Sequence, residues 1–180
     1  MLKPVVAFFS RQWLMIRVVG TFILLIALFF SLLTYTPIVK RVDIAWMLAQ
    51  LSAWLSWALL CVIGLVMDFP VRIEGTNLAS GEFIVDVSPA CSGAVPSIIY
   101  LAAVLAFPTS WRSKMIGVGL GVSIIHGVNL LRVVALFMIG LFFNEWFHET
   151  HVYIAQALVV AIAVATWLFW AGRFADAPGH

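Results

Sequence analysis

The sequence predicts an all-α, polytopic integral membrane protein with about five transmembrane helices and a small extracytoplasmic β-hairpin before a cysteine loop. Of its 180 residues, 64% are hydrophobic and only 10% are charged, and the mean hydropathy is +1.11. Soluble domains carry about 25% charged residues, and a soluble core of this size needs more polar surface to cover it. A polar interruption at 68–89 predicts the hairpin. We expect residues 1–180 to form a single membrane domain.

Charge and cysteine content exclude two other classes of protein. The formal net charge of +2 is too small to predict a nucleic-acid partner, and the basic residues lie at the ends of apolar segments, where they orient helices in a bilayer. The two cysteines lie in unlike settings, so we expect no disulfide framework. Cys61 lies within an apolar run and is typical of a small buried hydrophobic residue.

Residues 13–67 contain two N-terminal hydrophobic segments. The first, 13–35, ends before Pro37 and is longer than the apolar stretch of a signal peptide, about 7–15 residues, so we expect a retained transmembrane helix. The second, 44–67, is long enough to span a bilayer. Five spans is the simpler count, but whether the second segment crosses or lies in the interface stays open. Two full crossings before the cysteine would place three basic residues outside, against the positive-inside tendency: Lys3, Arg11 and Arg17.

Residues 68–93 interrupt the apolar pattern and predict an external hairpin followed by a cysteine loop. Residues 71–74 and 82–87 combine β-branched or aromatic residues with alternating charges, which is typical of strands, and the glycine-containing stretch 75–81 predicts the turn between them. Cys91 then comes directly before a helix start, because Pro96 is tolerated only in the first helical turn.

Residues 94–171 predict the helices of a catalytic core. The third apolar segment, 94–107, is followed by a basic turn. The fourth, 115–143, is long enough for one extended crossing, with a break near Gly127 left open. The fifth, 151–171, is followed by a basic residue and a polar tail.

The basic turn between the third and fourth segments predicts where the candidate site residues lie. If Arg112 and Lys114 are cytoplasmic, the third segment starts outside and Cys91 is outside as well. Arg132 follows Arg112 by about 20 residues, or roughly 30 Å of helix, which places it near the outer boundary. His151 opens the last segment at the same face. We therefore expect Cys91, Arg132 and His151 at one depth, on the extracytoplasmic face.

Arg132 is the most informative of the polar residues inside the apolar segments. A charged side chain within a bilayer costs about 2.5–3.5 kcal/mol even on lenient insertion scales, so such residues usually have a function. Asn129 and His126 precede it at spacings of three and lie on the same helical face. This arrangement favours an inward polar stripe over an arginine that only extends toward the headgroups.

Cys91 and the histidines of the last polar link complete a set of groups suited to acyl transfer. The partial positive charge of a helix N-terminus favours a thiolate at Cys91. His151 could take the thiol proton, with His148 and Glu149 beside it, while Arg132 stabilises the developing oxyanion. The two histidines are one residue too close for the His-Glu-x-x-His pattern of zinc proteases, so we expect no metal site.

Two other classes of function stay open on the residues alone. A small transporter could use a polar path along Arg132, Asn129 and His126. A non-catalytic membrane scaffold could bind partners through the Gly-x-x-x-Gly face formed by Gly117 and Gly121, although such a face is more typical of helix packing.

Several short motifs together resemble the exosortase/archaeosortase family, most closely its short exosortase H branch, over about residues 70–170. The core motifs are Ala90-Cys91-Ser92-Gly93, Asn129-Leu130-Leu131-Arg132-Val133, and a histidine at the start of the last helix in His151-Val152-Tyr153-x-x-Gln156. The Gly81-Glu82-Phe83 stretch and the Phe107-Pro108-x-x-Trp111-Arg112-x-Lys114 turn extend the resemblance. The family often has an arginine shortly after Cys-Ser-Gly, where this chain has Ala94-Val95-Pro96-Ser97.

The resemblance implies a cysteine transpeptidase or peptidase of the inner (cytoplasmic) membrane. Such proteins act on the C-terminal sorting signals of exported proteins, PEP-CTERM-like signals made of a short motif, a transmembrane helix and a basic tail. By motif, Cys91 is the nucleophile that forms the acyl thioester, Arg132 stabilises the oxyanion or substrate, and His151 is the general base and acid. Asn129, His148 and Glu149 are expected in supporting roles. The implied partners are the sorting helix of the substrate and membrane lipids, with no nucleic acid and no cofactor.

Overall fold

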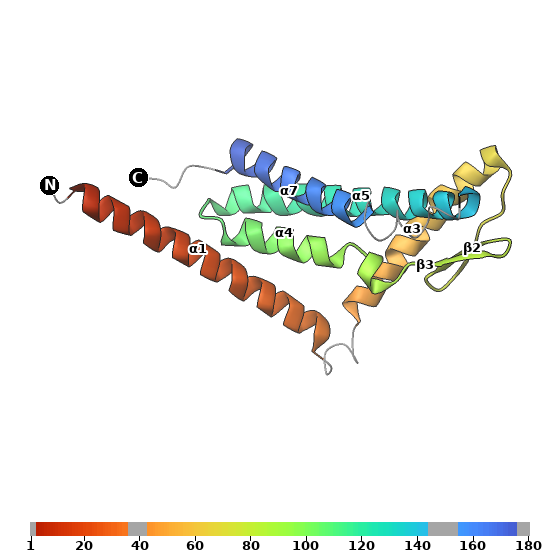
Figure 1. The fold of residues 1–180 in the computed structure, drawn as a ribbon, viewed down its shortest axis with the longest axis horizontal. Helices are drawn as coiled ribbons and strands as arrows, with labels where there is room; N and C mark the ends of the chain where they lie inside the picture. The colour runs from red at the N-terminus through yellow and green to blue at the C-terminus, as the bar shows by residue number, and fades with distance from the viewer. Residues whose placement is uncertain (1–2, 36–42, 144–154, 176–180) are drawn as a thin grey trace.

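The computed structural model describes residues 3–35, 43–143 and 155–175, and within them the chain is mostly helical with one small sheet (Figure 1). In chain order, the elements are α1 (Lys3–Thr34), α3 (Ile44–Met67), β1 (Arg72–Glu74), β2 (Asn77–Ser80), β3 (Phe83–Asp86), the 3₁₀ helix η1 (Pro89–Cys91), α4 (Ala94–Ala106), α5 (Trp111–Phe142) and α7 (Ala155–Arg173). The polytopic α-helical fold with a small sheet before the cysteine loop is confirmed.

Within the described ranges, four helices are long and apolar enough to cross a membrane: Gln12–Thr34 of α1, all of α3, all of α5, and Gln156–Arg173 of α7. The predicted third span, α4, has only 13 residues, or about 20 Å of helix, against a hydrocarbon core of about 30 Å. The chain is therefore a multi-pass membrane protein in which α4 is shorter than a full span.

Helices α4, α5 and α7 pack into a bundle, and glycines of α5 allow the close approach. A Cβ at Gly121 would lie 1.9 Å from the Tyr100 ring of α4, and one at Gly117 would lie 2.6 Å from Trp170 of α7. The Tyr100 hydroxyl donates to the Gly117 carbonyl at 3.0 Å, and the Trp170 indole donates to the Ser113 carbonyl at 2.8 Å. The Gly-x-x-x-Gly face thus serves packing within the chain.

Helix α5 is continuous through Gly127, so the break considered near this residue does not occur. Neighbouring elements hold the helix on both sides of this glycine. At its N-terminal end, Ser110 accepts a hydrogen bond from the Ser113 amide, and Lys114 donates to the Leu105 carbonyl of α4 at 2.6 Å. Toward the other end, Phe137 is fully buried against α3 and the sheet.

The segment between α3 and the cysteine loop is a three-stranded antiparallel sheet in the order β1-β2-β3. The stretch predicted as the turn of a two-stranded hairpin contains a strand of its own, which pairs Leu78 with Ile73 on one side and with Val85 on the other. Gly75 and Gly81 adopt φ values of +65° and +59° at the two tight turns, where glycine carries no steric penalty. Leu78 is fully buried and anchors the sheet.

Helix α3 begins and ends where the sequence predicts, with a cap at each end. The Asp43 carboxylate accepts from the Trp46 amide at 2.9 Å, and Asp68 closes the helix in the left-handed conformation. In Figure 1, α3 crosses the end of the bundle obliquely and lies beside the sheet. Residues of α3, the sheet, η1 and the C-terminal part of α5 form one apolar cluster, and residues of α4, α5 and α7 form a second.

Helix α1 packs along α4, and Figure 1 places its N-terminus at the same end of the molecule as the C-terminus of α7 and the α4–α5 turn. The cysteine loop, α3 and the sheet lie toward the opposite end. Helix α3 therefore lies obliquely at one end of the bundle, whereas α5 runs along its length. Whether residues 44–67 cross the bilayer or lie in its interface, the question that the sequence leaves open, depends on this oblique orientation of α3.

Candidate active site

Cys91 ends the short 3₁₀ helix η1 and is 9% exposed. Its amide donates to the Ser88 carbonyl at 2.8 Å, which closes the 3₁₀ turn. Ser92, fully buried, donates its hydroxyl proton to the Pro89 carbonyl at 2.7 Å and accepts from the Ala94 amide at 3.3 Å. The Ser92 side chain therefore ties the cysteine turn to the first residue of α4. The sequence reasoning did not assign this role, although a serine between a turn and a helix start is typical of such local hydrogen bonding.

Gly93 lets the chain turn from η1 into α4. It adopts φ +78°, in the left-handed region that favours glycine, and its carbonyl accepts from the Ser97 amide to start the helix. A Cβ at this position would lie 3.3 Å from Cγ of Asn129 on α5. The loop therefore approaches α5 so closely that a side chain at this position would require Asn129 or the loop to shift by a few tenths of an ångström.

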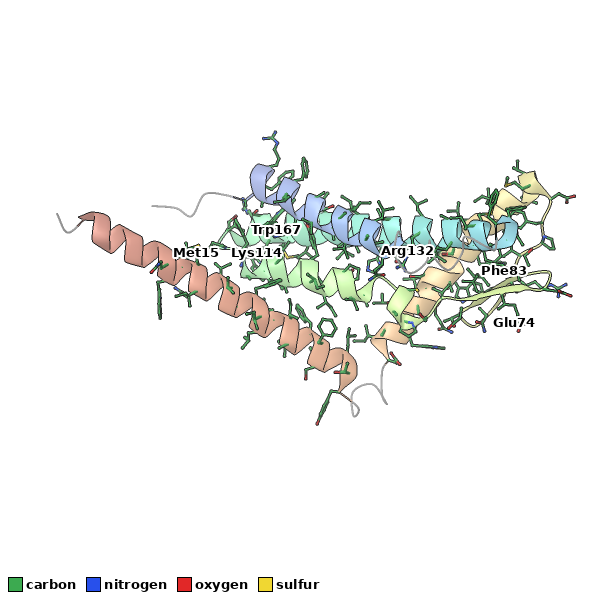
Figure 2. All side chains as sticks on the ribbon, viewed as in Figure 1. Met15, Glu74, Phe83, Lys114, Arg132 and Trp167 are labelled. Atoms are coloured by element: carbon green, nitrogen blue, oxygen red, sulfur yellow. The ribbon has the colours of Figure 1, made fainter. Side chains whose placement is uncertain are left out.

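Arg132 reaches the cysteine from α5. Its Nη2 lies 3.9 Å from the Sγ of Cys91, and it is as buried as the thiol, with 9% of its surface exposed. Figure 2 shows Arg132 where α5 passes over the junction of α3 and α4, with Lys114 toward the opposite end of the same helix. A guanidinium at this distance, on a largely buried side chain, is placed where it could stabilise an oxyanion formed next to the sulfur.

The polar stripe predicted on α5 is present, and it faces α4 and the cysteine loop. Asn129, 1% exposed, donates through Nδ2 to the Cys91 carbonyl at 2.8 Å. One helical turn deeper, Nε2 of the half-buried His126 lies 3.3 Å from Oγ of Ser97 on α4. The stripe thus consists of three contacts stacked along α5, two of them to Cys91 itself.

Burial leaves some polar atoms of this region without hydrogen bonds from the described residues. These are Nε of Arg132 and Oδ1 of Asn129. Both atoms belong to side chains that contact Cys91, whereas two further buried atoms without a partner among the described residues, Ser56 Oγ and Trp167 Nε1, lie on α3 and α7. A bound peptide could pair with the two atoms at Cys91, because a buried donor and acceptor are costly to leave unpaired.

The structure brings together two of the three predicted catalytic residues, Cys91 and Arg132, and adds the predicted supporting residue Asn129. The third, His151, lies outside the described residues, as do His148 and Glu149. Their predicted roles as general base and supporting groups stay predictions.

The family model for transmembrane exosortases (Exosortase_EpsH) matches residues 4–171. No curated protein and no solved structure gives a significant match. The matched region covers nearly the whole chain, including the cysteine loop, α5 and all but the last two residues of α7. The chain therefore belongs to the transmembrane exosortase family.

Proposed function

We propose that this protein is a membrane-embedded cysteine transpeptidase or peptidase that cleaves C-terminal sorting signals of exported proteins through a thioester acyl-enzyme. The observation that carries the proposal is the 3.9 Å contact between Cys91 Sγ and Arg132 Nη2, both buried at one end of a helical bundle. A buried arginine inside an apolar helix is expensive unless it has a function. Family membership supplies the class of reaction.

In the proposed reaction, His151 takes the thiol proton of Cys91, and the thiolate attacks the carbonyl carbon of the scissile peptide bond. The carbonyl oxygen gains the negative charge, which the Arg132 guanidinium stabilises. The C–N bond then breaks, the amine leaves with the proton from His151, and an acyl thioester remains on Cys91. Attack by water or an amine, with His151 now acting as base, releases the product and restores the thiol.

The distribution of charge supports an extracytoplasmic location for this site in the inner membrane. The acidic residues Glu74, Glu82 and Asp86 lie in the sheet or its turns near the cysteine end, and Figure 2 shows Glu74 there. Basic residues favour the cytoplasmic side. Six of them lie in the part of α1 toward the N-terminus, at the start of α5 and at the end of α7: Lys3, Arg11, Arg17, Arg112, Lys114 and Arg173.

Membership of the exosortase family implies the substrate, and this placement is compatible with it. A sorting signal anchored by its own transmembrane helix would sit beside the bundle, with the motif before that helix at the depth of Cys91. The substrate partner is thus an exported protein with a C-terminal helix and basic tail, surrounded by membrane lipids. We retain the predicted division of this single membrane domain into N-terminal segments (13–67), an external sheet and cysteine loop (68–93) and core helices (94–171).

The transporter and scaffold alternatives receive less support. In the described part of α5 no buried polar path continues past His126, because the next polar residue, Ser123, is exposed and Ile125 and Gly121 lie against the apolar cluster around Tyr100. Gly117 and Gly121 face Trp170 and Tyr100 of the same chain, so this glycine face is occupied and offers no surface to another protein.

The test is processing of a secreted reporter fused to a motif–helix–basic tail segment encoded in the same genome. We expect Cys91→Ala and Arg132→Ala to abolish processing while the protein remains inserted, and Cys61→Ala to process normally, since Cys61 lies in α3 away from this contact. Mass spectrometry should find a reporter-derived acyl group on Cys91. Normal processing by Cys91→Ala would refute the proposal.

A further inference from the structure

We infer that Asn129 is a positioning residue, which holds the backbone of Cys91 so that its thiol meets Arg132 and the substrate in one geometry. The inference rests on the proposed function and adds the group that sets the geometry. Asn129 Nδ2 lies 2.8 Å from the Cys91 carbonyl oxygen, well within hydrogen-bond range. Because a carbonyl can only accept, this contact also fixes which end of the amide faces the loop.

The Cys91 carbonyl lies at the point where the backbone changes course. The 3₁₀ turn ends at Cys91, Ser92 stays in the helical region at φ −74°, and Gly93 switches to φ +78° before α4 begins. Other carbonyls of this loop are held by local amides: those of Ser88, Pro89 and Gly93 accept from residues three or four positions later in the chain. Asn129 is the described side chain that ties the Cys91 carbonyl to another element.

The same cysteine is therefore held twice by one turn of α5. Asn129 binds its main chain, and Arg132, three residues further on the same helical face, contacts its sulfur. Two attachments to one rigid helix define both the position and the direction of the side chain. The local bonds of Cys91 and Ser92 hold the turn itself, and the Asn129 bond adds a fixed attachment of the Cys91 main chain to α5.

The burial of Asn129 indicates that its amide serves this hydrogen bond and not only packing. Asn129 is 1% exposed, and its Oδ1 has no hydrogen-bond donor among the described residues. An unpaired buried acceptor is unfavourable, so a leucine of similar size would fill the same space at lower free-energy cost. Asn129 also packs against the loop at Gly93, where a Cβ would lie 3.3 Å from its Cγ. This close packing is a second constraint on the position of the amide.

The experiment measures the accessibility of the thiol and catalysis separately, in full-length protein carrying Cys61→Ala so that Cys91 is the sole cysteine. The probe of accessibility is N-ethylmaleimide, an uncharged reagent, with alkylation of Cys91 followed by mass spectrometry. The variants are Asn129→Leu, which removes the donor, and Asn129→Gln, which keeps it on a longer side chain. His126→Leu is the matched control, because it replaces a polar group on the same helix face that contacts Ser97 instead.

We expect Asn129→Leu to raise the alkylation rate by about two- to tenfold, the range for loss of one net hydrogen bond. Its kcat for reporter processing should fall by about 10- to 100-fold with KM unchanged, as for a misplacement of about 1 Å. Asn129→Gln should recover part of both, and His126→Leu should alkylate like the parent.

Equal alkylation of Asn129→Leu and the parent, or equal increases in Asn129→Leu and His126→Leu, would overturn the inference. A change in KM alone, with kcat unchanged, would also overturn the inference. If Asn129→Leu does not fold, Asn129→Gln carries the comparison. If the parent itself fails to process the reporter, the proposed function fails, while the alkylation rates still decide the role of Asn129.

Discussion

Gly93→Ala separates the strain in the backbone of the cysteine loop from the position of the loop against α5. An alanine at φ +78° costs about 1–2 kcal/mol, the penalty for a left-handed conformation with a Cβ. The same Cβ would lie 3.3 Å from Asn129, closer than an ordinary contact, so the loop or Asn129 must shift. Gly81→Ala is the matched variant, because Gly81 has φ +59° in a sheet turn with no heavy atom near the added Cβ.

Both variants should therefore lose about 1–2 kcal/mol of stability, measured by unfolding in detergent micelles. Only Gly93→Ala should lose processing as well, by about tenfold or more, because a shift of the cysteine loop of a few tenths of an ångström or more misplaces the nucleophile. The assay compares reporter cleavage at equal amounts of folded protein. Equal processing by the two variants would show that the contact between the loop and Asn129 does not position Cys91.

Two further predictions concern packing and orientation. Gly121→Ala should destabilise the bundle by about 1–3 kcal/mol through overpacking against Tyr100. Gly119→Ala, whose Cβ meets no atom within 4 Å, should be neutral or stabilising. Unfolding in micelles measures both, and equal changes in stability would contradict the packing. The orientation can be tested in protein with both natural cysteines replaced by alanine. A membrane-impermeant maleimide added from outside should label Glu82→Cys in the exposed sheet turn but not Gly172→Cys near the end of α7. The reverse pattern would invert the proposed orientation.

The helices were predictable from sequence because apolar length and end signals agree. The bounds of α3 follow directly from an apolar run between Asp43 and Asp68. The alignment of Cys91 with Arg132 was also predictable, since a count of residues along α5 gives depth. That count cannot give lateral distance, which depends on how α4 packs on α5 through Tyr100 and Gly121. The 3.9 Å contact therefore had to come from the structure.

The errors have local physical causes. The sequence predicts a turn at strand β2 because two glycines flank it and Asn77 has low strand propensity, yet burial of Leu78 and pairing on both sides hold the strand. Two glycines six residues apart were the available signal for two tight turns. Gly127 suggested a break in α5, but a glycine interrupts a helix only where no packing holds the flanking turns, and neighbouring elements pack against this helix on both sides of it.

The two apolar clusters divide the molecule in a way that allows exchange of parts. The cluster of α3, the sheet and the cysteine turn meets the rest of the protein chiefly through the C-terminal part of α5, at Val133, Val134 and Phe137. A replacement for α3 and the sheet has to match only this helix surface and the cysteine turn, while the second cluster keeps its packing. Recombination with other exosortases across residues 43–87 should thus leave the packing of α4, α5 and α7 intact.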